Sequence, residues 1–280
     1  MELSILEQLC FSTVRIETTD SQGNTYSGTG FFFEISVGDY KVPVIVTNKH
    51  VVNGMTSAHF IITEADEHGN PKYGSCFPVN FDVDFEKQWI MHPDPNVDLC
   101  IMPYNVLVQM ADRIFHKKLF YRVFESSLIP NTTQEEDIDV VEDVLMIGYP
   151  NGLWDKVNNM PIIRKGITAT KYSLDYNGKK EFVIDAACFP GSSGSPVILF
   201  NKGGYTDKKG NLKWGSGRLL LLGILYAGPQ LRVDGTIRVI TTPDSQSIGV
   251  QSNIPNNLGY IIKSKAILDF VPILKERFKI

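Results

Sequence analysis

Short apolar runs separated by turn-forming segments dominate the chain. Residues 13–18 alternate apolar and polar side chains, and residues 27–35 form a glycine-punctuated apolar stretch. Similar runs recur at 44–52, 58–63, 89–91, 144–152, 163–169, 197–200, 223–228 and 257–262. Runs of this length, rich in Val, Ile and Phe and bounded by Gly, Pro and Asn, predict β-strands. Their spacing favours an antiparallel β-barrel architecture.

Helical periodicity is confined to three segments. Leucines at every third position share one face of a short helix within residues 1–12, and residues 111–120 have the pattern of an amphipathic helix. Residues 263–278 carry a helical pattern that Pro272 interrupts, as expected for a helix that closes the fold. The sequence therefore predicts an all-β protein with an N-terminal helical segment and a C-terminal helix.

Length and composition describe a globular protein. With 280 residues, of which 43% are hydrophobic, the chain can bury a large core as one two-lobed domain or as two domains. A formal net charge of −4 provides no basic field, so a nucleic-acid partner is not expected. No run approaches the length of a membrane span, and the acidic first ten residues are unlike a signal peptide. We therefore expect a cytoplasmic protein, or a mature form cut from something longer.

The cysteines and histidines do not suggest a metal site. Cys10, Cys76, Cys100 and Cys188 are scattered and include no C-x-x-C pair, which favours free buried thiols over disulfides or metal ligands. No two of the five histidines are spaced i, i+4 on a helix, as a zinc site of that kind would require. We expect the protein to need no cofactor.

A serine between glycines is the strongest chemical signal. Residues 189–196 place Ser193 in a glycine-rich loop that runs into the apolar strand 197–200. Gly191 allows the backbone to turn two N–H groups, its own and that of Ser193, toward one point where an oxyanion could sit. The same residues also suit a simple polar turn, because Gly, Ser and Pro dominate turns for conformational reasons.

A serine hydroxyl is a poor nucleophile until a histidine accepts its proton and a carboxylate orients that histidine. His50 lies at the end of a β-branched run, and Asp98 precedes an apolar run that would bury its carboxylate. Asp94, between two prolines, is the weaker candidate for the orienting group. Surface or packing roles are expected for the other four histidines, namely His59, His68, His92 and His116.

The residues around these positions resemble the trypsin-like serine peptidases, closest to the HtrA-like and glutamyl-endopeptidase branch. The resemblance rests on Thr47-Asn48-Lys49-His50-Val51-Val52, on Asp98-Leu99, and on Ile184-Asp185-Ala186-Ala187-Cys188-Phe189-Pro190-Gly191-Ser192-Ser193-Gly194-Ser195-Pro196. It implies two antiparallel six-stranded β-barrels, residues 13–125 and 143–280, joined by an acidic connection at 126–142 and without a PDZ domain. It further implies a serine endopeptidase of protein or peptide substrates, with His50, Asp98 and Ser193 in the cleft between the barrels.

The resemblance also suggests where the specificity pocket lies. In the family, the residue six before the nucleophile is at the pocket floor, and here that residue is Ala187. The wall strand of the family matches residues 223–228, from which Leu225, Tyr226 and Ala227 would line the pocket. None of these residues is charged, so the match implies an apolar primary pocket.

Several features leave alternatives open. The polar stretches 201–218 and 230–257 depart from compact relatives of the family and are either regulatory insertions or passive surface hairpins. The acidic segment 126–142 is expected to be a solvated loop rather than a docking site for a basic partner. Besides an active protease, the sequence allows a protease-fold scaffold that only binds, and an enzyme that is silent until a partner or ligand activates it.

The residue before Ser193 leads to a prediction about activation. In digestive relatives this residue is an aspartate that binds the N-terminus released by proteolysis, whereas Ser192 occupies the position here. A neutral hydroxyl cannot offset the desolvation of a buried ammonium as a carboxylate does. The chain with residues 1–12 intact should therefore cleave a peptide substrate as fast as the chain trimmed by those residues. Activity that appears only after trimming would contradict this prediction.

Overall fold

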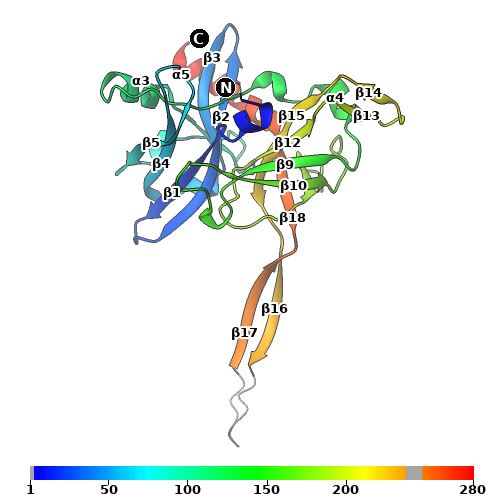
Figure 1. Cartoon of the computed structure of the whole chain (residues 1–280). Helices are drawn as coiled ribbons and strands as arrows, with labels where there is room; N and C mark the ends of the chain where they lie inside the picture. Colours follow the sequence, from blue (N-terminus) through cyan, green and yellow to red (C-terminus); the bar gives the residue numbers. More distant parts are fainter. Residues whose placement is uncertain (1–2, 238–247) are drawn as a thin grey trace, which may run out of the picture.

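In the computed structural model, which describes residues 3–237 and 248–280, most strands belong to two large sheets, one in each half of the chain (Figure 1). The strands of the first half are β1 (Thr13–Asp20), β2 (Thr25–Val37), β3 (Tyr40–Thr47), β4 (Met55–Ala65), β5 (Pro71–Phe81), β6 (Ile90–Met91), β7 (Cys100–Pro103) and β8 (Phe124–Glu125). They pair in the order β5-β4-β1-β2-β3-β7-β6, and β8 lies parallel to β2. Within the described residues this ladder stays open, so a closed six-stranded barrel is not seen in the first half. The terminal strand β6 has only two residues, so it has few backbone groups with which to pair with the other edge strand and close a barrel.

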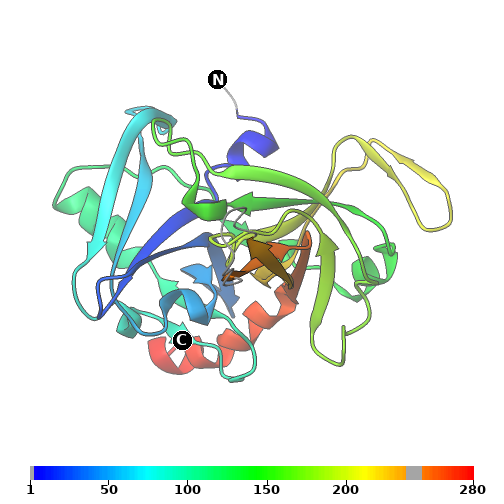
Figure 2. The same ribbon diagram turned by 90° about the horizontal axis from the view of Figure 1, so that it is seen from below.

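The second half closes into a six-stranded antiparallel barrel, as the sequence predicts. The pairing order is β10-β11-β18-β15-β12-β9. The strands are β9 (Asp143–Gly148), β10 (Ile162–Thr168), β11 (Glu181–Asp185), β12 (Pro196–Asn201), β15 (Arg218–Ala227) and β18 (Leu258–Lys263). Figure 2 views this barrel and the neighbouring sheet of the first half along the perpendicular direction.

Strand β2 shows how period-two alternation builds two cores from one run of phenylalanines. Phe31 and Phe33 point to one face and Phe32 to the other, because successive side chains of a strand alternate. All three are at most 2% exposed. Phe31 and Phe33 enter a core that both halves share, whereas Phe32 enters a core internal to the first half.

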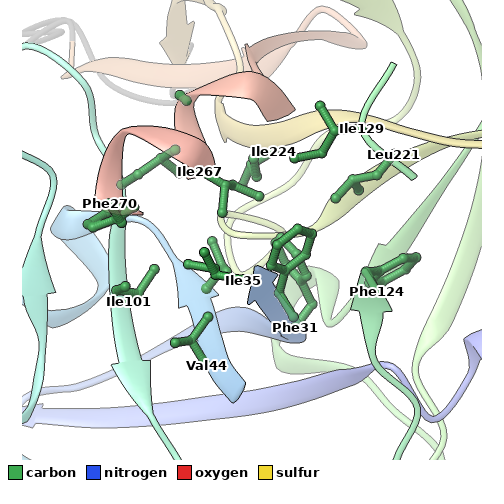
Figure 3. Packing of buried hydrophobic residues seen from close by; sticks show 14 of the residues in the cluster. Phe31, Ile35, Val44, Ile101, Phe124, Ile129, Leu221, Ile224, Ile267 and Phe270 are labelled. Carbon is green, nitrogen blue, oxygen red and sulfur yellow. The ribbon is translucent and has the colours of Figure 1, made fainter. Parts of the chain in front are cut away.

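We call the shared cluster the interlobe core. It combines residues of β2, β3, β7 and β8 with residues of the second barrel and of the C-terminal helical segment (Figure 3). Its members include Phe31, Ile35, Val44, Ile101, Phe124, Ile129, Leu221, Ile224, Ile267 and Phe270. Because these residues come from distant parts of the sequence, their burial fixes the two halves against each other.

The C-terminal segment is helical, with one difference from the expected pattern. A 3₁₀ segment, η4 (Ser264–Phe270), precedes α5 (Val271–Phe278). Pro272 lies in the first turn of α5, where its missing N–H has no intrahelical partner to lose, so it helps to start this helix rather than interrupt it.

The N-terminal helix is confirmed as α1 (Ile5–Leu9), which a capping box of Ser4 and Glu7 begins. The amphipathic helix expected at 111–120 is displaced, because α3 spans Asn105–Arg113. At His116 the backbone has φ 53°, a left-handed conformation that no helix continues through.

The acidic segment 126–142 is more ordered than a solvated loop. It contains the 3₁₀ turn η2 (Ser126–Leu128) and helix α4 (Thr132–Asp137). Three of its acids form ion pairs with the second half of the chain, Glu135 with Lys265 at 2.9 Å, Glu142 with Arg218 at 2.7 Å and Asp137 with Arg218 at 4.0 Å. These partners are distant in sequence, which is why the charge pattern alone suggested a free loop.

Both insertions contain antiparallel hairpins. Strands β13 (Gly204–Thr206) and β14 (Leu212–Trp214) pair within 201–218, and β16 (Gln230–Ile237) pairs with β17 (Ile248–Pro255) to form a ribbon that extends from the barrel (Figure 1). The middle of the 230–257 insertion, residues 238–247, lies outside the described residues. No helix in the described part of the chain has the length and apolar character needed to cross a membrane.

The interlobe core gives a stability prediction. Replacing Ile267, which is fully buried, with alanine should lower the free energy of unfolding by about 2–5 kcal/mol, because it leaves a cavity between the two halves. The matched control is Leu268→Ala at the neighbouring position. The side chain of Leu268 is 38% exposed, so this substitution should lower the free energy of unfolding by less than about 1 kcal/mol. Urea unfolding of both variants measures the difference, and equal losses would show that the core does not hold the halves together.

Candidate active site

His50 and Asp98 are held together by two contacts. His50 lies in α2 (Lys49–Val52), directly after β3, and its ring Nδ1 is 2.5 Å from Asp98 Oδ2. The backbone N–H of His50 donates to the other carboxylate oxygen, Oδ1, at 3.1 Å. Because Asp98 Oδ2 is the acceptor beside Nδ1, a neutral ring carries its proton on Nδ1 and leaves Nε2 as the acceptor.

Neighbouring residues position the loop that carries Asp98. Asn48 donates its side-chain amide to the backbone carbonyl of Asp98 at 2.8 Å. Asp94, the rival carboxylate, instead accepts the backbone N–H of Asn96 at 2.9 Å, and this hydrogen bond is the main reason why its pKa is lowered. The structure thus pairs His50 with Asp98 and leaves Asp94 to stabilise its own turn.

The other histidines serve elsewhere. His59 contacts Asn80, and His68 and His116 are exposed. His92 is buried and its Nε2 lies 3.2 Å from the carbonyl oxygen of Ala266, so it connects the loop before Asp98 to η4. These positions agree with the surface and packing roles expected from the sequence.

The loop that carries Ser193 presents two unused donors. Gly191 and Gly194 have φ of 86° and 88°, conformations that favour glycine. The N–H groups of Ser192, Gly194 and Ser195 all donate to backbone carbonyls. In contrast, the N–H groups of Gly191 and Ser193 have no acceptor among the described residues. Two such donors from adjoining turns can stabilise an oxyanion without competing protein partners.

The hydroxyl of Ser193 is not hydrogen-bonded to His50 in the described structure. It donates instead to the carbonyl oxygen of Tyr226, at 3.5 Å. The loop that carries Ser193 therefore lies beside Tyr226 at the end of β15. The hydrogen bond from Ser193 to His50 that the reaction requires is not formed. Hydrogen bonds between such groups are often long in the absence of substrate and shorten when it binds.

A cavity of about 230 Å³ opens beside Ser193. Its lining comprises Cys188, Phe189, Pro190, Ser193, Leu225, Ala227 and Gly228. Two of the residues expected to line a pocket, Leu225 and Ala227, are found there. Ala187 is outside the lining and Cys188 takes its place, a difference of one residue in a loop whose register the pattern could not fix.

Tyr226 also lies outside the cavity lining. The pairing register of β15 shifts between Leu225 and Ala227, and the hydroxyl of Tyr226 donates to Glu181 Oε2 at 2.9 Å. Burial and the neighbouring carboxylate raise the pKa of Tyr226. Burial also raises the pKa of Cys188 to about 11, so its thiol is neutral at pH 7 and adds no charge to the cavity.

Nothing in the described residues suggests a metal centre, since they contain no group of three or more His, Cys, Asp or Glu side chains able to hold a metal ion. The four cysteines, including Cys188, are free thiols.

Comparison with known proteins shows the family of the chain. A family model described as a trypsin-like peptidase domain matches residues 28–204. No curated protein matches the chain. Similar solved structures include the active form of the Rv3671c protease from M. tuberculosis, with 14% identity over 92% of this chain and 78% of that chain and a TM-score of 0.42. Others are GrC, with 14% identity, 100% and 98% coverage and a TM-score of 0.47, and HL collagenase, with 11% identity, 98% and 95% coverage and a TM-score of 0.48.

The backbone of the Ser193 loop gives a prediction of its own. A Cβ at Gly194 would collide with the carbonyl oxygen of Thr29, and the position has positive φ. Gly194→Ala should therefore lower the free energy of unfolding by about 1–2 kcal/mol because of the positive φ, and by about 1–3 kcal/mol more because of the collision. Gly38→Ala is the matched control, because Gly38 has φ 61° and open space around its Cβ position. Thermal unfolding of the two variants should separate these costs, and equal shifts in Tm would contradict the collision.

Proposed function

The chain belongs to the family of trypsin-like peptidase domains, and we propose that it is a serine endopeptidase that hydrolyses protein or peptide substrates. The observation that carries the proposal is the His50 ring, held by Asp98 with Nε2 left as a proton acceptor. Ser193 is the proposed nucleophile, and the free N–H groups of Gly191 and Ser193 are the proposed oxyanion hole.

In the proposed reaction, Ser193 Oγ attacks the carbonyl carbon of the scissile peptide while His50 Nε2 accepts the hydroxyl proton. The carbonyl oxygen becomes an oxyanion between the N–H groups of Gly191 and Ser193. His50 then returns the proton to the leaving amine, and the acyl-enzyme is hydrolysed by water in the reverse sequence. Asp98 stabilises the imidazolium throughout.

The described structure differs from this reaction in the hydrogen bond of the nucleophile. In the proposed reaction, the Ser193 hydroxyl leaves the carbonyl of Tyr226 and donates to His50 Nε2. A scaffold without activity and an enzyme that an activating partner or ligand switches on remain alternatives from the sequence. The complete set of nucleophile, base, orienting carboxylate and free donors supports an active enzyme over the scaffold. A cytoplasmic location remains a prediction from the sequence.

The proposed roles make a mutational prediction. Ser193→Ala and His50→Ala should each lower kcat for peptide hydrolysis by about 10⁴-fold or more, and the double variant should be hardly worse, because the three residues act as a unit. Ser192→Ala is the matched control in the same loop and should retain most of the activity. Inactivation by Ser192→Ala or Ser195→Ala, with Ser193→Ala active, would show that the nucleophile is wrongly assigned.

The cavity makes a prediction about specificity. Because no residue of its lining carries a charge and its thiol is neutral, cleavage should follow small or medium apolar side chains, since a buried unpaired charge is costly to desolvate. Profiling with a peptide library measures this preference, and dominant cleavage after Arg, Lys, Asp or Glu would contradict it. Cys188→Asp should shift the preference toward Lys and Arg, whereas Ala187→Asp should not, because Ala187 lies outside the lining.

A further inference from the structure

Thr29 lies where the first half of the chain touches the loop that carries Ser193. It is in the middle of β2 and is completely buried. Its hydroxyl donates to the carbonyl oxygen of Gly191 at 2.9 Å and accepts the backbone N–H of Tyr149 at 3.1 Å. Its own backbone N–H donates to the carbonyl oxygen of Ser193 at 2.8 Å. One residue of the first half thus binds the Ser193 loop at two points.

The same residue is also tied to the segment that leads to His50. The carbonyl oxygen of Thr29 accepts a hydrogen bond from Thr47 Oγ1 at 2.7 Å, and Thr47 is three residues before His50. All the backbone and side-chain polar atoms of Thr29 are therefore engaged, and they connect the histidine segment to the serine loop.

Glycines allow this close approach. A Cβ at Gly148 would lie 2.7 Å from Thr29 Oγ1, and a Cβ at Gly194 would lie 2.6 Å from Thr47 Oγ1. Contacts this short do not occur for real Cβ atoms, so a side chain at either position would push the loop away from Thr29. The packing also leaves little room for a water to replace the Thr29 hydroxyl.

The hydrogen bonds of Thr29 fall on both sides of the peptide group that supplies the Ser193 N–H. The Gly191 carbonyl fixes the plane of the peptide group before it, and the Ser193 carbonyl fixes the plane of the peptide group after it. With both neighbours fixed, the peptide group between Ser192 and Ser193 cannot flip easily, and its N–H stays directed toward the proposed oxyanion position.

We propose that Thr29 is a positioning residue that holds the loop carrying Ser193 from the opposite half of the chain, in the conformation that directs the Ser193 N–H toward the oxyanion position. The inference rests on the proposed function and deepens it, because it assigns the order of the oxyanion hole to a residue that does not touch substrate. Without the Thr29 hydroxyl, the carbonyl oxygen of Gly191 loses its hydrogen-bond donor, and the loop gains conformations in which the Ser193 N–H points elsewhere.

The first test uses peptide hydrolysis. Thr29→Val keeps the shape of the side chain and removes its hydroxyl, and it should lower kcat by about 10- to 100-fold with KM changed by less than about 3-fold, since the loss affects the transition state. Thr29→Ser keeps the hydroxyl and should restore most of the activity. A Thr29→Val variant as active as the wild type, or a Thr29→Ser variant equally impaired, would overturn the inference.

Thr168→Val is the matched control. Thr168 is also fully buried, and its hydroxyl likewise donates to a carbonyl, that of Val140 at 2.7 Å, and accepts a backbone N–H, that of Glu142 at 2.8 Å. These partners lie in the acidic segment and not in the serine loop. Thr168→Val should lower Tm as Thr29→Val does but leave kcat unchanged. An equal loss of kcat in both variants would overturn the inference, because it would show that Thr29 contributes only to stability.

A second test does not depend on catalysis. Amide hydrogen exchange, followed by mass spectrometry in the Ser193→Ala background, should be faster in the peptide covering 189–196 when Thr29→Val is added, and unchanged there for Thr29→Ser. Unchanged exchange, or an increase spread evenly over both halves, would overturn the inference. If the wild-type chain shows no Ser193-dependent hydrolysis, the proposed function fails, and this measurement still decides the role of Thr29.

Discussion

The interlobe core is the constraint on which the site depends, because the proposed base and nucleophile come from different halves of the chain. Phe31 of β2 and Ile224 of β15 belong to this cluster, and Ile267 of the C-terminal segment packs in it as well. Burial of such side chains stabilises by about 1.5–3 kcal/mol each, more than any exposed ion pair of this protein provides. The proposed pairing of His50 with the Ser193 loop therefore requires this apolar packing to hold the two halves of the chain together.

The polar groups of the site differ in how many hydrogen bonds hold them in the orientation that the proposed reaction needs. Asp98 holds His50 at the ring and at the backbone, and the carbonyls of the serine loop are held by Thr29, so the groups that would stabilise charge are in place before a substrate arrives. The hydroxyl of Ser193 is the exception, since it remains on the carbonyl of Tyr226. Electrostatic stabilisation is most effective when the dipoles need no reorganisation at the moment of reaction.

Much of the fold followed from the sequence because strand alternation and turn residues are local signals. The closed second barrel, the N-terminal helix and the proximity of His50 to Asp98 were predicted from them or from the family resemblance. The differences involve contacts between distant residues. Cys188 lines the cavity and Ala187 does not, because the course of an irregular loop is set by its contacts and not by a repeating pattern. Thr29 went unnoticed because a threonine in an apolar strand carries no signal until its partners 120 and 162 residues away are known.

The central claim, that Ser193 is a nucleophile activated within this site, is tested most directly by labelling with a fluorophosphonate probe. The account predicts one covalent adduct, located by peptide mass spectrometry on Ser193, that is absent in Ser193→Ala and strongly slowed in His50→Ala. An adduct on another residue, or no adduct on the folded wild-type chain, would contradict it.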